Sequence, residues 1–436
     1  MSLYVAAFRP SRRGARPLDP AKARERSVRR RVGITWGLLV FNVLTYGGTT
    51  VIPIPYRVGQ LITQAALQVA LLMALTLNRK ALLRPNIFLL VVSLLLVGAL
   101  ITVIQPPFHR GTIFRTVRLT EFIAVLWLLT PWWGRRDLFL VRCQMVTMGA
   151  VLGSVLLGLV VAPGLTLSGR LGGVIWPMPA TQVAHYAAVM TGLATVLWVC
   201  GLLRGRVALV TVVVSVTILI LTHTRTALVG MVAGILVSGL SLIVARPRAR
   251  KLFATLGVLA GIAVIALSGV ITAWLARGQS TSELTGLSGR TQVWSQLLAA
   301  PRNGFQEIFG FGLSNASFNG FAIDSNWLAS YQQQGLFGVV ICAALLLFLL
   351  VAAYFQPRGV QRALALFLVT YCLVASYTEV GFTDASTYLL DLTLAASLLL
   401  PPLANLRTDR FLATPMPRSR LGQVIPDRPQ SPGLVG

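Results

Sequence analysis

The sequence predicts an all-α, polytopic membrane protein with about 12 transmembrane helices. Of its 436 residues, 55% are hydrophobic and only 11% are charged, whereas about a quarter of a typical soluble domain is charged. The mean hydropathy is +0.75. Apolar segments long enough to cross a bilayer also follow one another along nearly the whole chain, so lipid rather than water is the expected surrounding for most of it.

The apolar segments give the expected spans. Most are flanked by prolines, glycines or charged residues, and each is long enough to cross the hydrocarbon layer as a helix. The predicted spans are 34–52, 57–77, 85–104, 116–132, 138–162, 181–203, 207–223, 226–245, 252–274, 334–355, 361–378 and 386–403.

The basic residues indicate the orientation of these spans, because they occupy every second loop and both tails. The positive-inside rule therefore predicts a basic cytosolic tail at 1–33 and a second cytosolic tail at 404–436. Transmembrane helices 1–9 fall within 34–275 and helices 10–12 within 334–403. Between them, 276–333 is predicted as an extracytoplasmic, partly helical substrate loop, in which 303–320, rich in Gly, Asn and Phe, is expected to be irregular. The loop residues that set this orientation are Arg79, Lys80, Arg84, Arg135, Arg136, Arg204, Arg206, Arg246, Arg248, Arg250, Lys251, Arg358 and Arg362.

Several classes of function are excluded by composition and motifs. The net charge of +26 is spread over short loops and tails, which leaves no compact basic domain for nucleic acid. The four cysteines lie in or beside apolar segments without CxxC spacing, so we expect no structural metal. We find no P-loop and no DxD-type acidic pair in an outer loop, so we expect neither ATP, nor a metal-held nucleotide sugar, nor another cofactor.

Arginines on the predicted outer side point to an anionic ligand. Snorkelling to the interface explains most of them without any function. Arg225 differs, because its turn lies between two apolar segments and is too short to leave the membrane. An ionisable group at that depth needs a polar cavity and a partner, and a guanidinium donates two parallel hydrogen bonds to phosphate. We therefore predict that Arg225 binds a phosphate group.

Two further arginines lie beside segments that could help to bind a ligand. Arg290 precedes a predicted short amphipathic helix at Thr291–Ala300, whose free amides would also favour an anion. Arg170 opens a segment with Gly172 and Gly173, where the backbone could approach a ligand closely or simply form a tight turn. Both alternatives for the glycines remain open at this point.

The acidic residues and histidines supply candidate proton acceptors. Asp324 is either a general base for a sugar hydroxyl or an N-cap of the helix that follows. His223, two residues before Arg225, is the rival base. Glu379 is expected to balance the arginines or to bind sugar hydroxyls, and so is Asp384. Glu121 is expected to pair with the arginines that precede it on the same span, and His185 to have a satisfied role in the core.

Five short motifs follow one another along the chain. A Thr-x-Thr-Arg-Thr-Ala-Leu turn (222–228) is followed by Ser-Gly-Arg-Thr-x-x-Trp (288–294). Next come Gly-Phe-Gly-Leu-Ser-Asn (310–315), Asp-Ser-Asn-Trp-Leu (324–328) and Gln-Gly-Leu-Phe-Gly (334–338). Motifs in this order resemble the O-antigen ligase and polymerase family of bacterial envelope glycosyltransferases. The resemblance covers about residues 165–345, and all of these motifs are predicted on one side of the membrane.

The resemblance implies a metal-independent, inverting glycosyltransferase of the bacterial cytoplasmic membrane. Its donor would be a polyprenyl-diphosphate-linked oligosaccharide, whose diphosphate Arg225 and Arg290 would hold. Ligases of the family carry a histidine before the asparagine where this chain has Ser325, so a polymerase with Asp324 as base is favoured over a ligase. Membrane lipid and other polysaccharide-assembly membrane proteins are the expected partners. The expected substrate-binding residues are Arg170, Asn326, His223, Glu379 and Trp294.

Two other classes of function remain as alternatives. A lipid-linked glycan flippase or transporter would need arginines that reach the cytosolic half of the membrane, and the predicted spans hold almost no charge there. Such proteins also often contain an internal duplication, which this sequence does not show. A structural membrane scaffold would leave the outward arginines unexplained.

Overall fold

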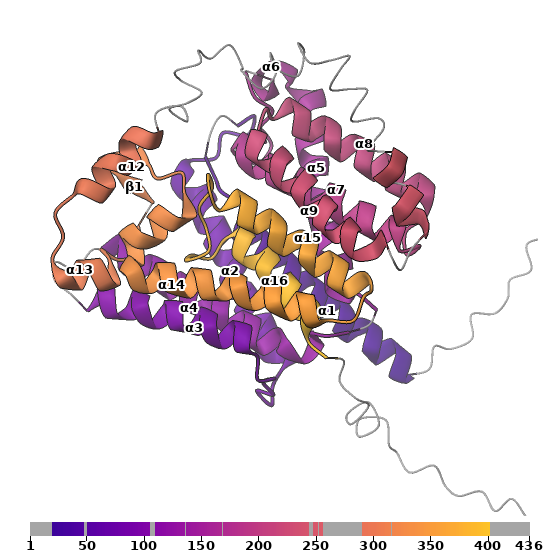
Figure 1. Ribbon diagram of the computed structural model, residues 1–436, viewed down its shortest axis with the longest axis horizontal. Coiled ribbons are helices and arrows are strands. Elements are labelled where there is room, and N and C mark those ends of the chain that lie inside the picture. Colours follow the sequence, from indigo (N-terminus) through magenta and orange to yellow (C-terminus); the bar gives the residue numbers. More distant parts are fainter. Residues whose placement is uncertain are drawn as a thin grey trace, which may run out of the picture. The chain divides into compact units, whose positions relative to one another are not determined.

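The computed structural model describes residues 20–47, 50–104, 110–135, 137–167, 169–243, 247–251, 253–255, 290–314 and 316–401. Almost all of the fold described below belongs to one unit, Arg24–Pro402. This part of the chain is built almost entirely from α-helices, as predicted (Figure 1).

The first group of helices precedes the gap that begins after residue 255. It comprises α1 (Pro20–Asn42), α2 (Tyr56–Leu77), α3 (Ile87–Val103), α4 (Arg110–Leu129), the 3₁₀ turn η1 (Thr130–Trp132), α5 (Phe139–Val161), α6 (Pro163–Thr166), α7 (Ala180–Val199), α8 (Gly205–Leu221) and α9 (Arg225–Ile243). The second group comprises α12 (Arg290–Ala299), α13 (Gly304–Phe309), the strands β1 (Ser317–Phe318) and β2 (Phe321–Ala322), α14 (Asn326–Phe355), α15 (Val360–Ala375) and α16 (Thr387–Leu399).

The observed helices can be compared with the predicted spans in position and in length. Most predicted spans coincide with a helix; 34–52 overlaps α1 only over 34–42, and 252–274 lies largely outside the described residues. Within the described part, 5 helices are long and apolar enough to cross a membrane, namely α2, α5, α7, α9 and α14. The apolar helices α3, α8, α15 and α16 are shorter. The chain is thus a helical protein with several segments that can span a bilayer, and the count of about 12 is not confirmed.

Several predicted boundaries differ from the observed ones. Helix α1 runs from Pro20 to Asn42, so part of the expected cytosolic tail is helical and the helix ends ten residues before the predicted span 34–52 does. Helix α4 begins at Arg110 rather than at 116. Helix α14 begins at Asn326 rather than at 334, and it is kinked at Gly335, whose φ is 62°. The kink leaves helix carbonyls without their usual partners, and those of Gln332 and Gln333 accept instead from the amides at 311 and 312, at 2.9 and 2.8 Å. The predicted span therefore began where the kink lies.

Helices α7, α15 and α16 form the most buried part of the core. Most of their side chains are inaccessible, including large ones such as Tyr186, Phe367 and Tyr371. Helix α15 packs against α7, α9, α14 and α16. Close approach depends on small residues, because a Cβ added at Gly192 of α7 would overlap the ring of Phe367. Small residues at contacts are typical of helices that pack tightly within membranes.

The segment between α12 and α14 is more ordered than the sequence suggests. The amphipathic helix predicted at Thr291–Ala300 corresponds to α12. The following stretch was expected to be irregular, but it contains α13, capped by Asn303, and a two-stranded hairpin. Asn319 and Gly320 have φ values of 50° and 83°, which gives the Asn-Gly turn that favours a tight hairpin. This hairpin ends two residues before Asp324 and so fixes where that carboxylate lies.

Candidate functional site

The loop between α15 and α16, residues 376–386, is where the predicted site segments meet. The Ser376 carbonyl accepts from the Asn326 amide at 2.9 Å. The hydroxyls of Thr226 and Thr378 lie 2.5 Å apart. The ring of Trp294 meets the ring of Tyr377 edge to face, with centroids 5.7 Å apart. Segments that are far apart in sequence are thus held around one short loop.

Arg290 and Asp324 form an ion pair within this site. The Arg290 Nε lies 3.0 Å from the Asp324 Oδ2. Their side chains are 30% and 43% exposed, so water reaches both groups. The Asp324 carboxylate is occupied by the Arg290 guanidinium. The N-cap alternative does not apply to Asp324, because the N-cap position of α14 belongs to Ser325.

Glu379 is a carboxyl of altered acidity within the site. Burial raises the pKa of its carboxyl from 4.5 to about 7, and the charge of Asp324 acts in the same direction. Arg290 and Arg170 oppose this rise in the pKa of Glu379. A carboxyl with a pKa near the working pH can accept and release a proton readily. The sequence had indicated only a charge-balancing or sugar-binding role for it.

Arg170 holds the turn that leads into α9. Its Nε donates to the carbonyl oxygen of Thr222 at 3.0 Å, and its terminal nitrogen donates to the hydroxyl of Thr224 at 2.9 Å. Burial lowers the pKa of Arg170, while the charge of Glu379 raises it. The neighbouring glycines form the tight turn that was one of the two alternatives, since Gly173 exchanges backbone hydrogen bonds with Met178 at 3.0 and 3.2 Å.

His223 and Arg225 lie in the turn that Arg170 supports. His223 has a left-handed backbone with φ 50°, which an L-residue adopts only when its surroundings hold it there. Arg225 is the first residue of α9, and its Nε is buried. The contact between Thr226 and Thr378 places this turn beside the loop that carries Glu379. A common grip of Arg225 and Arg290 on one diphosphate stays a prediction.

Asn326 and Trp294 support the site through the 376–386 loop. Asn326 is fully buried, and its side-chain oxygen accepts from the amides of Gly381 and Phe382 at 3.2 and 2.9 Å. Trp294 packs on Tyr377, two residues before Glu379. Because these contacts are with the protein itself, both residues are placed to position the loop, and a direct role in binding substrate stays a prediction.

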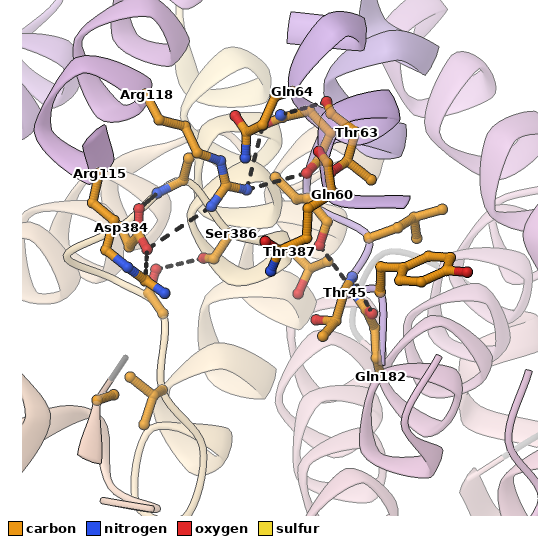
Figure 2. A pocket seen from close by; sticks show the side chains of 18 of the residues that line it. Thr45, Gln60, Thr63, Gln64, Arg115, Arg118, Gln182, Asp384, Ser386 and Thr387 are labelled. Atoms are coloured by element: carbon orange, nitrogen blue, oxygen red, sulfur yellow. Dashed lines mark hydrogen bonds and ion pairs between the residues drawn. The ribbon is translucent and has the colours of Figure 1, made fainter. Parts of the chain in front are cut away.

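A large polar cavity of about 940 Å³ adjoins Glu379. On one wall Arg115 and Arg118 approach the carboxylate of Asp384 (Figure 2), with nitrogen–oxygen distances of 2.9 and 4.0 Å. The pairing of Arg115 and Arg118 with Glu121 was therefore wrong, since Glu121 accepts from Gln68 at 2.6 Å. Arg115 and Arg118 stand three residues apart on α4, a spacing that places both side chains on one face.

The rest of the cavity is lined mainly by amide, hydroxyl and aromatic side chains. Among the residues that line it are Asn42, Thr45, Tyr46, Tyr56, Arg57, Gln60, Gln64, Gln182, His185, Gln333, Ser386, Thr387 and Tyr388. Most of them come from α2, α7 and the segment 386–388 at the start of α16, and α4 supplies Arg115 and Arg118. Sequence reasoning missed this cavity, because its polar residues are scattered singly over helices that read as transmembrane spans.

Beneath the cavity, a network of polar side chains is buried among the helices. His185 of α7 is 1% exposed, and its Nε2 lies 3.0 Å from the Oδ2 of Asp391 on α16. The other ring nitrogen lies 3.1 Å from the hydroxyl of Tyr371. Gln144 donates to Asp391 at 3.0 Å and accepts from the indole of Trp36 at 2.8 Å. His185 thus lies in the core, as expected, but its Nε2 and the Asp391 Oδ2 are close together without a hydrogen bond between them.

The chemistry open to the site follows from its charges. In the described part of the chain, no group of three or more His, Cys, Asp and Glu residues is placed to hold a metal ion. What the site offers is guanidinium groups for an anion, one carboxyl with a pKa near neutrality, and a roomy polar cavity beside them. Such a set can bind a phosphorylated substrate and accept a proton from a hydroxyl.

Comparison with known proteins adds no identification. No protein-family model matches the chain, and no curated protein matches it either. The likeness to the O-antigen ligase and polymerase family therefore depends on the order of the motifs in the sequence.

Proposed function

We propose that the protein is a metal-independent, inverting glycosyltransferase that polymerises polyprenyl-diphosphate-linked oligosaccharide units on the outer face of the bacterial cytoplasmic membrane. The observation that carries the proposal is the meeting of Arg170, Arg290, Asp324 and Glu379 from distant parts of the chain. They meet beside a polar cavity of about 940 Å³. The motif order that resembles the O-antigen ligase and polymerase family supports the same function.

The first proposed role of the arginines is to bind the leaving group. In the proposed reaction Arg290 and Arg225 bind the donor's diphosphate and stabilise the negative charge that develops as the bond to the sugar breaks. Arg170 holds the turn of Arg225 in place through Thr222 and Thr224. Asp324 orients Arg290, because the pair is 3.0 Å apart. A guanidinium held in this way loses little conformational entropy when it binds a phosphate.

Glu379 is the proton acceptor that we propose in place of Asp324. It lines the cavity where an acceptor sugar would lie, whereas Asp324 is paired with Arg290. The raised pKa of Glu379, about 7, suits general base catalysis near neutral pH. His223 remains the alternative base, because it lies in the turn that Arg170 supports.

The proposed reaction forms one bond and breaks one. The acceptor hydroxyl oxygen attacks the anomeric carbon of the donor from the face opposite the diphosphate and forms the new glycosidic bond. The bond between the anomeric carbon and the phosphate oxygen breaks, and its electron pair leaves with the polyprenyl diphosphate. The hydroxyl proton passes to the Glu379 carboxylate. The configuration at the anomeric carbon is inverted.

A reconstituted assay tests this function. The full-length chain in liposomes receives a synthetic undecaprenyl-diphosphate-linked repeat unit, with EDTA present and no ion gradient, and product length is followed on gels. We expect polymer from the wild type and at least a tenfold lower rate from Arg290→Lys, because lysine lacks the planar fork. Arg110→Lys is the control, since Arg110 is exposed and outside the cavity.

Three results of this assay would contradict the proposal. Translocation of the lipid without chain growth would favour the flippase, and transfer of the glycan to a different acceptor would favour the ligase. Full activity of Arg290→Lys would remove the role assigned to that guanidinium.

A further inference from the structure

We infer that the cavity lined by Arg115, Arg118 and Asp384 receives the acceptor glycan and selects one that carries a carboxylate, such as a uronic acid. This inference rests on the proposed function and names the class of its substrate. The sequence and the resemblance leave the sugar undefined.

The charge balance of the cavity wall is the first argument. Arg115 and Arg118 share the single carboxylate of Asp384, at 2.9 and 4.0 Å, so this group of three carries one net positive charge. Arg57 and Glu379 also line the cavity and cancel each other when both are ionised. The cavity wall therefore keeps a net positive charge, which favours a sugar that carries a carboxylate over a neutral sugar.

The surroundings of Arg118 are the second argument. Its side chain is only 16% exposed, and one terminal nitrogen is occupied by the backbone oxygen of Asn42 at 3.1 Å. Its Nε is buried, so a ligand can reach only the terminal nitrogens of the guanidinium. A buried charge is costly unless an anion compensates it, and the Asp384 carboxylate near Arg118 is shared with Arg115. A bound carboxylate would compensate this charge, and it would supply the acceptors that guanidinium groups prefer.

The neutral part of the lining is the third argument, and it favours a glycan over a free anion. Gln60 and Gln64 stand four residues apart on α2 and line the cavity together with the aromatic rings of Tyr46 and Tyr56. Amides donate to and accept from sugar hydroxyls, and aromatic rings provide apolar surface for sugar rings. A volume of about 940 Å³ lies near the upper end of the roughly 300–1,000 Å³ found for ligand pockets. It therefore suits an oligosaccharide.

The position of the cavity links it to the proposed chemistry. Glu379 lines the cavity and is also under the electrostatic influence of Arg170 and Arg290. A glycan held by Arg115 and Arg118 would therefore lie in the same cavity that Glu379 lines. This is the arrangement that transfer from a donor to an acceptor hydroxyl requires.

A binding experiment with defined sugars tests the inference. The purified full-length chain in detergent is titrated with trigalacturonate, with the same trisaccharide after its carboxyl groups are reduced to neutral galactose, and with inorganic pyrophosphate. We expect trigalacturonate to bind about ten- to a hundredfold more tightly than the reduced form, because charge-assisted hydrogen bonds are lost on reduction. Arg118→Gln should abolish this preference, and Arg110→Gln should keep it.

A second variant keeps the test decisive if Arg118→Gln fails to fold. Asp384→Asn removes the shared carboxylate and raises the net charge of the cavity wall, so we expect tighter binding of trigalacturonate and unchanged binding of the neutral trisaccharide. Equal binding of the acidic and neutral sugars to the wild type would overturn the inference. Arg118-dependent binding of pyrophosphate in preference to trigalacturonate would also overturn it, and would assign the cavity to a lipid diphosphate.

The two proposals can fail separately. Loss of the acidic preference together with normal chain growth would defeat only the assignment of the acceptor. Acidic preference without chain growth from any lipid-linked substrate would defeat only the transferase.

Discussion

Two carboxylates with a basic partner at the same distance lie in opposite surroundings. Asp391 lies 3.0 Å from His185 with exposed fractions of 0% and 1%, and Asp324 lies 3.0 Å from Arg290 with 43% and 30%. The first pair joins α7 to α16 in the centre of the helices. The second joins the start of α12 to the residue before the N-cap of α14, where water and a ligand have access.

The difference shows how the surroundings of an ion pair decide whether it contributes to stability or to ligand binding. Removing one partner of a buried pair is strongly destabilising, because the other is left without compensation in an apolar medium. A half-exposed pair contributes little, since water screens it and replaces the lost partner. The buried pair is therefore expected to hold the helices together, and the exposed pair to act on a ligand. Each prediction below tests one side of this comparison.

The largest expected effect is on stability. Asp391→Ala removes the partner of His185 and the acceptor of Gln144, so we expect a loss of about 3–5 kcal/mol in the free energy of unfolding. Unfolding of the detergent-solubilised chain by titration with a denaturing detergent measures it. Asp324→Ala is the matched control and should cost about 0–1 kcal/mol. Similar losses of unfolding free energy in both variants would contradict the assignment of a stabilising role to the buried pair alone.

The next effect is on catalysis. Glu379→Gln should lower the rate of chain growth by about 10²- to 10⁴-fold, the range for loss of a general base, with little change in folding. The wild-type rate should rise with pH and level off above about 7, because the raised pKa of Glu379 leaves its carboxyl protonated below that value. A Gln variant that keeps both the rate and the pH profile would return the role of base to Asp324 or His223.

The smallest effect is the dependence of stability on pH. The pKa of Glu379 is raised from 4.5 to about 7 in the folded chain, so the folded state binds this proton more tightly than the unfolded state. Its contribution to stability is then fully present below about 4.5 and is lost as the pH rises to about 7. Unfolding curves at several pH values should show this decline in the wild type and a shallower one in Glu379→Gln. Parallel curves would argue against a buried, titrating carboxyl.

The helices could be predicted from the sequence, but several partners could not. Hydropathy is a local property, so the apolar segments coincide with helices almost throughout. Pairing depends on tertiary contacts, and Asp384 lies 269 residues from Arg115. Glu121 looked like the partner because it is close in sequence, yet it faces Gln68 on α2. The kink at Gly335 was also hidden, since a single glycine in an apolar segment does not reveal a turn of the helix axis.

The sequence predicted which residues belong to the candidate site better than it predicted what each of them does. The sequence singled out arginines on the predicted outer side, where arginine is disfavoured, and acidic residues on the same side or within motifs. They include Arg170, Arg290, Asp324 and Glu379. Their roles depend on burial and on neighbours, which no single sequence position carries. Glu379 thus changes from a charge-balancing group to the proposed base, and Asp324 changes from the base to the partner of Arg290.

The stoichiometry of leaving-group release tests the central claim most directly. The purified chain is given a lipid-linked repeat unit in EDTA without an ion gradient, and free polyprenyl diphosphate is quantified together with newly formed glycosidic bonds. We predict one diphosphate released for each bond formed, and neither product from Arg290→Ala. Lipid that crosses the membrane with its glycan still attached and no diphosphate released would contradict the account.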